Sequence, residues 1–217
     1  MTPSTSRHKV FVIGLVGGVA SGKSQVARMF ASQGAAVIDA DALGHSVLQS
    51  PQVAAELGRA FGPDILDSNG SVDRERLGRL VFGSDAESNE RLKQLEHIVH
   101  PLIRAQAVKL LQQYQLRGDP PAAIVIDAPL LLEANWAPLC DLILFVDSPT
   151  EIRRARALQR GWTAEHFAAR EDAQQTLNDK RAAATHFVSG TLDESSLRQT
   201  IAGLLRQMRP ADVSRGP

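Results

Sequence analysis

The run from Gly17 to Ser24 reads G-G-V-A-S-G-K-S, which has the residue types and spacing of a phosphate-binding P-loop. In such a loop, backbone N–H groups wrap the β-phosphate of a nucleotide, and the N-terminus of the following helix helps. Lys23 would reach the β- and γ-phosphates, and the Ser24 hydroxyl would coordinate Mg²⁺. The predicted nucleotide-binding residues are Gly17, Gly18, Val19, Ala20, Ser21, Gly22, Lys23, Ser24 and Gln25.

The residues on both sides of this run favour a P-loop over a glycine-rich turn with an incidental Lys-Ser. The apolar, β-branched residues 10–13 before it are typical of a buried parallel strand. Residues 25–32 after it have helical spacing, with Val26, Met29 and Phe30 on one face, and Gly34 is placed to end that helix. The order strand, glycine-rich turn, helix is the one that a P-loop requires.

Two carboxylates follow the next predicted strand, residues 35–38. Asp39 and Asp41 are two positions apart, so they would leave the strand on the same side of the pleat. If this strand lies beside the P-loop strand, one of them, and we favour Asp41, can take the proton of an acceptor hydroxyl during phosphoryl transfer. The alternative is that Asp41 only caps a helix beginning at Ala42.

A further aspartate, Asp127, ends the predicted strand at residues 124–126. An acid at the end of a strand beside the P-loop can hold Mg²⁺. Aspartate is also common in turns, so the sequence leaves both interpretations of Asp127 open.

Strands and helices alternate along most of the chain, which predicts a three-layer α/β fold of the P-loop NTPase type with a parallel sheet. Two segments are longer than a simple crossover and are expected beside the ligand crevice. The first is a helical insertion, which we interpret as the acceptor-binding subdomain, and the second is an arginine-rich lid. The expected ranges are 9–41, 120–150 and 185–208 for the core, about 42–117 for the insertion, about 151–182 for the lid and 209–217 for a frayed tail. Further helices are predicted at 85–117, 150–159, 163–184 and 194–208, and strands at 142–146 and 186–188.

The composition is that of a compact enzyme that handles small molecules. The 217 residues carry 24 basic and 24 acidic side chains, so there is no overall positive field to attract nucleic acid. The single cysteine, Cys140, cannot form an internal disulfide and is expected to be a buried small residue. No apolar run is long enough to span a membrane and the N-terminus lacks a signal-peptide core, so we expect a cytoplasmic protein. Nothing in the sequence indicates an obligate protein partner.

Four motifs together make the chain resemble the dephospho-CoA kinase family across residues 9–208. They are the P-loop, Val37-Ile-Asp-Ala-Asp41, His100-Pro-Leu-Ile103 with Arg104, and Asp127-Ala-Pro-Leu-Leu-Leu-Glu133. The predicted lid is similar too, with Leu158-Gln159-Arg160, Gln174 and Lys180. The resemblance implies transfer of the ATP γ-phosphate to the ribose 3′-hydroxyl of dephospho-CoA, with Mg²⁺, as the last step of coenzyme A synthesis.

The resemblance also implies residue roles. It assigns the general base to Asp41, ATP binding to the P-loop with Lys23, and acceptor binding to His100 and Arg104. Arg156 and Arg160 fall on the lid, where guanidinium groups can pair with phosphate oxygens and neutralise charge as the γ-phosphoryl group moves. From the residues alone, an arginine-rich helix is more often a solvated face, and His100-Pro101 could begin a helix.

The chain departs from the family pattern at a few positions. Gln25 replaces a common threonine after the P-loop serine, and Thr185–Gly190 is a shortened version of the turn expected near the adenine. The family does not always have an acid at the position of Asp127.

Two other classes of protein fit parts of the pattern. Another small P-loop kinase, such as shikimate kinase, also combines a P-loop with an Asp-x-Asp strand end, but it lacks the long helical insertion. A GTPase-type switch would explain the two D-x-x-G matches beginning at Asp41 and Asp67, but no Asn-Lys-x-Asp element follows.

Overall fold

The computed structural model describes residues 9–83 and 85–208; the predicted tail at 209–217 lies outside them. The chain divides into two compact units. Unit 1 contains the described residues up to Ile38 and from Leu111 onward, and unit 2 is Asp39–Leu110. Each unit has its own hydrophobic core.

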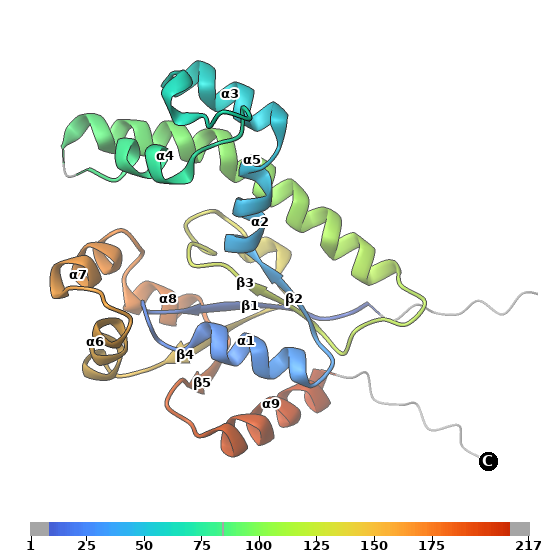
Figure 1. Ribbon diagram of the computed structural model, residues 1–217. Helices are drawn as coiled ribbons and strands as arrows, with labels where there is room; N and C mark the ends of the chain where they lie inside the picture. The colour runs from blue at the N-terminus through green and yellow to red at the C-terminus, as the bar shows by residue number, and fades with distance from the viewer. Residues whose placement is uncertain (1–8, 84, 209–217) are drawn as a thin grey trace, which may run out of the picture. The chain divides into compact units, whose positions relative to one another are not determined.

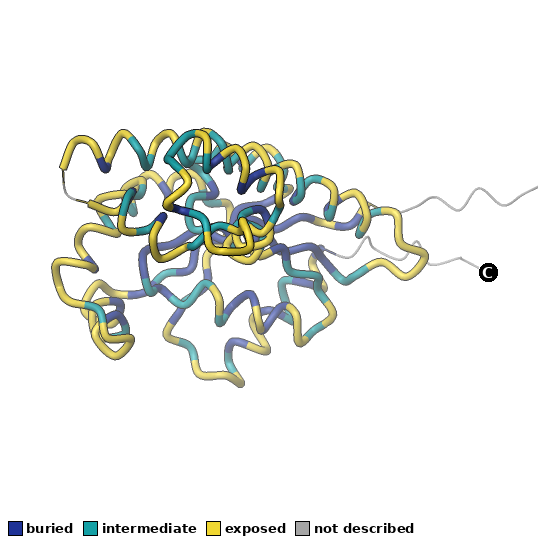
Figure 2. The backbone as a smooth tube through the Cα atoms, turned by 45° about the horizontal axis from the view of Figure 1, so that its top comes forward, coloured by how far each residue is buried: buried dark blue, intermediate teal, exposed yellow. Residues whose placement is uncertain are grey.

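Unit 1 is built on one five-stranded parallel sheet. Its strands are β1 (Val12–Gly17), β2 (Ala36–Asp39), β3 (Ile124–Asp127), β4 (Leu142–Asp147) and β5 (His186–Ser189), in the spatial order β2-β3-β1-β4-β5. The strand that leads to Asp39 and Asp41 is therefore not beside the P-loop strand, because β3 lies between β2 and β1. The central strands β1, β3 and β4 are rich in β-branched residues and leucine and are buried along almost their whole length, as strands covered on both faces must be. Figure 2 shows these strands as nearly continuous buried stretches.

Helices cover both faces of the sheet (Figure 1). On one face, α1 (Lys23–Ser32) and α9 (Glu194–Met208) pack against strand residues that include Ile13, Leu15 and Leu144. On the other face, Arg181 of α8 (Leu177–Ala183) lies over the Phe145 ring. This is the predicted three-layer α/β arrangement, and the P-loop type of fold is confirmed.

Parallel strands end at a common edge of the sheet, and the residues of chemical interest lie there. β1 ends at Gly17, the first residue of the P-loop, and β3 ends at Asp127, which pairs in register with Leu15 of β1. Ligands of open α/β sheets bind outside the carboxyl ends of the strands. The fold therefore brings the P-loop and Asp127 to the same edge.

Unit 2 is helical. It contains α2 (Ala40–Leu48), α3 (Pro51–Phe61), the short 3-10 helix η1 (Pro63–Ile65), α4 (Arg74–Val81) and most of α5 (Ala86–Leu116). Val47, Leu57, Ile65, Leu77 and Val81 form its buried centre, against which the apolar side chains of α5 pack. The predicted helical insertion is therefore a unit with its own core.

Two elements differ from the prediction. The first strand extends to Gly17 instead of ending at residue 13. Gly14 lies inside this strand, and a glycine is needed there because a Cβ would meet the Cys140 sulfur and the Leu131 side chain. The stretch 163–184 is two helices, α7 (Ala164–Asp172) and α8, because Thr176 caps α8 and the Gln175 amide donates to the Glu133 carboxylate. The remaining predicted helices and strands lie where expected to within a few residues.

Candidate active site

The P-loop has the backbone conformation of an anion-binding nest. Ala20 has a positive φ of 57°, and Gly22, which precedes α1, has a φ of 103°. The Ser21 N–H closes a turn onto the Gly18 carbonyl at 3.1 Å. Left-handed residues within such a loop turn successive N–H groups toward one point, and the N-terminus of α1 adds its own N–H groups and positive dipole end. The loop is therefore built to hold a phosphate.

Lys23 and Ser24 occupy the first turn of α1. The Lys23 Nζ donates to the Gly17 and Gly18 carbonyls at 3.3 Å each, so the side chain lies back across the loop. Ser24 is exposed. A phosphate entering the loop would meet the ammonium of Lys23, and the Ser24 hydroxyl remains accessible to a cation that accompanies it.

The donor groups at this edge of the sheet suit Mg²⁺. Mg²⁺ prefers oxygen ligands and is commonly held by one or two protein groups together with substrate phosphates. Ser24 and Asp127 offer a hydroxyl and a carboxylate in unit 1. Within residues 9–83 and 85–208, no three His, Cys, Asp or Glu residues cluster as a protein-only metal cage would require. The residues therefore fit a magnesium ion that is bound with nucleotide.

Arg156 is in contact with the P-loop. It lies on α6 (Thr150–Gln159) and donates to the Ser21 carbonyl at 3.2 Å and to the Gly190 carbonyl at 2.8 Å. Gly190 follows β5, and a Cβ there would overlap the Ser21 carbonyl oxygen. Arg156 therefore joins the P-loop to the altered turn at 185–190, which stays close to the loop despite its departure from the family pattern.

Arg160 differs from Arg156 in its surroundings. It is the C-cap residue of α6, not a member of the helix, and its side chain is exposed. Of the two predicted lid arginines, Arg156 thus lies on the loop backbone and Arg160 has an exposed side chain.

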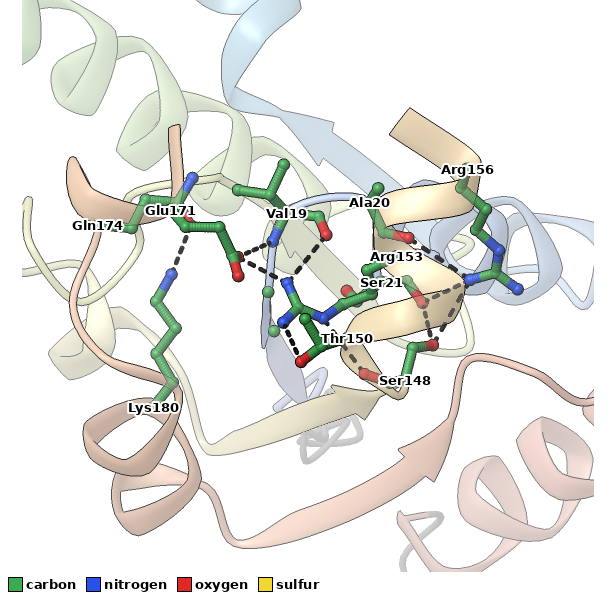
Figure 3. A network of polar contacts seen from close by, with 12 residues as sticks. Val19, Ala20, Ser21, Ser148, Thr150, Arg153, Arg156, Glu171, Gln174 and Lys180 are labelled. Carbon is green, nitrogen blue, oxygen red and sulfur yellow. Dashed lines mark hydrogen bonds and ion pairs between the residues drawn. The ribbon is translucent and has the colours of Figure 1, made fainter. Parts of the chain in front are cut away.

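A network of charged side chains, missed by the sequence analysis, surrounds the first half of the loop (Figure 3). Arg153 of α6 is 1% exposed and pairs with Glu171 of α7 at 2.6 Å. Ser148, just after β4, donates to the Ser21 carbonyl at 2.8 Å. In the sequence, Arg153 is marked only by its position. It lies one turn before Ala157, and both residues are on the inward face of α6.

Lys180 is a second buried cation of the lid segment, residues 151–182. It is 2% exposed, donates to the Gln174 Oε1 at 2.6 Å and lies 3.6 Å from the Glu133 carboxylate. Burial lowers the pKa of Lys180, although Glu133 favours the charged form. Together with Gly18 and Glu171, Lys180 lines a cavity of about 320 Å³.

Asp41, His100 and Arg104 all lie in unit 2. Asp41 is exposed in the first turn of α2, and His100 and Arg104 are half-buried, one turn apart on α5. The two helices meet where a Cβ on Gly44 would lie 3.4 Å from Ile103. The structure therefore places these three residues on two neighbouring helices.

Two structural alternatives for these residues are wrong. α2 begins at Ala40, and its cap is Asp39, whose side chain accepts the Ala42 N–H at 3.0 Å. Asp41 is therefore not the cap. His100-Pro101 lies in the middle of α5 and does not begin a helix.

Cys140 behaves as a structural residue. Burial, with the Asp141 carboxylate beside it, raises the pKa of the Cys140 thiol to about 12, and the thiol faces the Trp136 carbonyl at 3.6 Å. A thiol with so high a pKa is not a nucleophile at neutral pH. Cys140 is half-buried instead of buried, and its raised pKa agrees with the expectation that it is not a nucleophile.

Comparison with known proteins places the chain in a family. Residues 11–194 match the family model for dephospho-CoA kinase. The chain is 40% identical over 188 residues to a dephospho-CoA kinase of Symbiobacterium thermophilum, an alignment that covers 85% of this chain and 76% of that one.

Solved structures agree with the family match. The crystal structure of TT1252 from Thermus thermophilus has a TM-score of 0.76 and 34% identity, covering 94% of this chain and all of that one. The dephospho-CoA kinase of Campylobacter jejuni has a TM-score of 0.62 and 25% identity, covering 91% and 96%. The resemblance noted from the four sequence motifs is confirmed, and the chain belongs to the dephospho-CoA kinase family.

Proposed function

We propose that this protein transfers the γ-phosphoryl group of ATP to the ribose 3′-hydroxyl of dephospho-CoA, giving coenzyme A and ADP. The family match fits this reaction. The observation that carries it in the structure is the P-loop nest at the end of β1, beside the strand that ends at Asp127. The direct test is to incubate the protein with ATP and dephospho-CoA and to look by mass spectrometry for coenzyme A.

The P-loop holds the donor in this proposal. Its N–H groups and the N-terminus of α1 bind the β-phosphate, and the Lys23 ammonium bridges the β- and γ-phosphates. Ser24, with Asp127, would hold Mg²⁺, which when bound neutralises charge on the phosphate oxygens. Phosphoryl transfer depends mainly on such positioning and charge stabilisation.

Asp41 acts on the acceptor. Its carboxylate takes the proton of the 3′-hydroxyl as the new O–P bond forms and the bond between the γ-phosphorus and the bridging oxygen of ADP breaks. His100 and Arg104 bind the acceptor, as the family resemblance implies; a guanidinium and an imidazole can both donate to its phosphate oxygens. Asp41 is exposed, so it lies on a surface that a substrate can approach.

The lid segment completes the donor site. Arg156 and Arg160 supply positive charge to the triphosphate, and closure would exclude water that competes with the acceptor hydroxyl. Because Arg156 already holds the P-loop backbone, its role combines loop support with charge, whereas Arg160 has its side chain in solvent.

The different surroundings of the two arginines give a prediction. We expect Arg160→Ala to lower kcat/KM for ATP with little change in melting temperature, since a charge-assisted pair with phosphate contributes ~1.5–3 kcal/mol. Arg156→Ala should lower both kcat/KM and the melting temperature, because it removes bonds to Ser21 and Gly190. Arg154→Ala, an exposed position on the same helix, is the control. A large loss of stability with normal kinetics in Arg160→Ala would show that Arg160 is structural.

We expect the phosphoryl donor to be ATP, and we expect the protein to bind small molecules only. A nucleotide comparison by thermal shift separates the kinase from a GTPase-type switch, since ATP should raise the melting temperature and GTP should not.

Among the described residues, no helix combines the length and the apolar character needed to cross a membrane. We propose that the reaction takes place in the cytoplasm.

A further inference from the structure

The pair formed by buried Arg153 and half-buried Glu171 has no role in the proposed reaction, yet both of its members contact Val19 of the P-loop (Figure 3). Arg153 Nη1 donates to the Val19 carbonyl at 3.3 Å and to Glu171 Oε1 at 2.6 Å. The same Glu171 oxygen accepts the Val19 N–H at 3.1 Å. The pair therefore holds both backbone polar groups of a single loop residue.

The side chain of Val19 is held by the same part of the chain. It is 6% exposed and packs with Ala157 of α6 and Phe167 of α7. Trp162, between these helices, lies against the same cluster. Backbone and side chain of Val19 are thus fixed by α6 and α7 through independent contacts.

Arg153 is itself immobilised and cannot reach a nucleotide. Its guanidinium also donates to the Ser148 carbonyl at 3.2 Å and to Thr150 Oγ1 at 3.1 Å, and it lies 5.6 Å from the centre of the Phe167 ring. A Cβ on Gly18 would lie 2.5 Å from Nη1, so the guanidinium is packed directly against the loop backbone. Any effect of Arg153 on the reaction must therefore pass through the loop.

Arg153 controls the orientation of one peptide unit, the one between Val19 and Ala20. In a trans peptide the carbonyl and the following N–H point in opposite directions. With the Val19 carbonyl bound to Arg153, the Ala20 N–H is turned to the opposite side of the unit. Ala20 has a φ of 57°, a left-handed conformation that is unfavourable for a residue with a Cβ and needs support from its surroundings.

We propose that Arg153 is a positioning residue of this kinase: paired with Glu171, it fixes the Val19–Ala20 peptide in the orientation that receives phosphate before the nucleotide arrives. The proposal rests on the nucleotide-binding role of the P-loop proposed above. A loop ordered in advance loses less conformational entropy when its ligand binds, so Arg153 raises nucleotide affinity without touching the nucleotide.

The test compares nucleotide affinity with stability in matched variants. The dissociation constant for ADP is measured by calorimetry well below each melting temperature, and kcat and KM for ATP are measured beside it. Arg153→Met should weaken ADP binding about 5- to 30-fold, which corresponds to ordering the backbone of one residue on binding. KM for ATP should rise by a similar factor with kcat little changed, since the lost contribution is to binding. Arg154→Met, one position along the same helix, should bind ADP as the parent does.

A second variant separates positioning from stability. Arg153→Met alone leaves the Glu171 carboxylate without its partner, and the protein loses stability. Arg153→Met combined with Glu171→Gln removes the unpaired charge, while the glutamine oxygen can still accept the Val19 N–H, so stability should return. We expect the double variant to regain its melting temperature and still to bind ADP weakly. If affinity returned together with stability, the pair would be structural only and the proposal would be wrong.

A conservative variant covers the case in which neither of these proteins folds. Arg153→Lys keeps the buried charge beside Glu171 but cannot make the same set of bonds, so its ADP affinity should lie between the parent and the expected range for Arg153→Met. Parent-like affinity and KM in Arg153→Lys would overturn the proposal. If the parent protein binds ADP but does not phosphorylate dephospho-CoA, the proposed function is wrong. The ADP dissociation constants of the variants would still test the positioning role of Arg153.

Discussion

Lys23→Ala is expected to reduce phosphoryl transfer to background while leaving the fold intact. The ammonium is the group that would bridge the β- and γ-phosphates, so its loss removes positioning and charge stabilisation together. In the folded protein Lys23 Nζ donates to the Gly17 and Gly18 carbonyls at 3.3 Å each, and water can replace these two long hydrogen bonds in the alanine variant. ADP formation and the thermal melting curve are the two measurements.

Lys93→Ala provides the control for Lys23→Ala, because Lys93 is exposed on α5, where its ammonium lies 3.9 Å from the Glu90 carboxylate. It should retain both activity and melting temperature. Normal turnover in a folded Lys23→Ala protein would refute the assignment of the P-loop as the donor site.

Asp41→Asn is expected to lower kcat by ~10²–10⁴-fold, the usual contribution of a general base. Asparagine keeps the size and one acceptor oxygen but cannot take the proton of the 3′-hydroxyl at neutral pH. ATP affinity should be nearly unchanged, because the P-loop is intact. Steady-state kinetics with dephospho-CoA and calorimetry with ATP measure the two effects separately.

The melting temperature is a useful second measurement for Asp41→Asn. Asp39 caps α2, so Asp39→Ala should lower the melting temperature, whereas Asp41→Asn should change it little. Asp64→Asn, at an exposed position of unit 2, is the control for activity. A large thermal destabilisation of Asp41→Asn with normal kcat would assign Asp41 a structural role.

Most of the fold could be predicted because its signals are local. Helices at 150–159 and 194–208 have the predicted ends, since helical periodicity and caps are written in adjacent residues. The break between α7 and α8 has a local part, the Thr176 cap of α8, and a long-range part, the Gln175 N–H bound to Glu133, and only the first is contained in adjacent residues. Gly14 inside β1 likewise has a long-range reason, because Cys140 and Leu131 leave no room for a side chain at that position.

The candidate site shows the same difference between local signals and long-range contacts. The P-loop could be predicted because its chemistry is contained in eight consecutive residues. The support of that loop comes from residues separated from it by more than a hundred positions, such as Arg153 on Val19 and Ser148 on Ser21. The local sequence distinguishes the buried Arg153 from the exposed Arg154 only by its place one turn before Ala157, and packing assigns the two arginines different roles.

The central claim is that dephospho-CoA is the acceptor. ADP release, followed in a coupled assay with ATP and Mg²⁺, tests it most directly when dephospho-CoA is compared with shikimate and adenosine. The account predicts rapid ADP release with dephospho-CoA, its loss in Lys23→Ala, and background rates with the other two acceptors. ADP release that does not depend on dephospho-CoA, or that is faster with shikimate or adenosine, would contradict it.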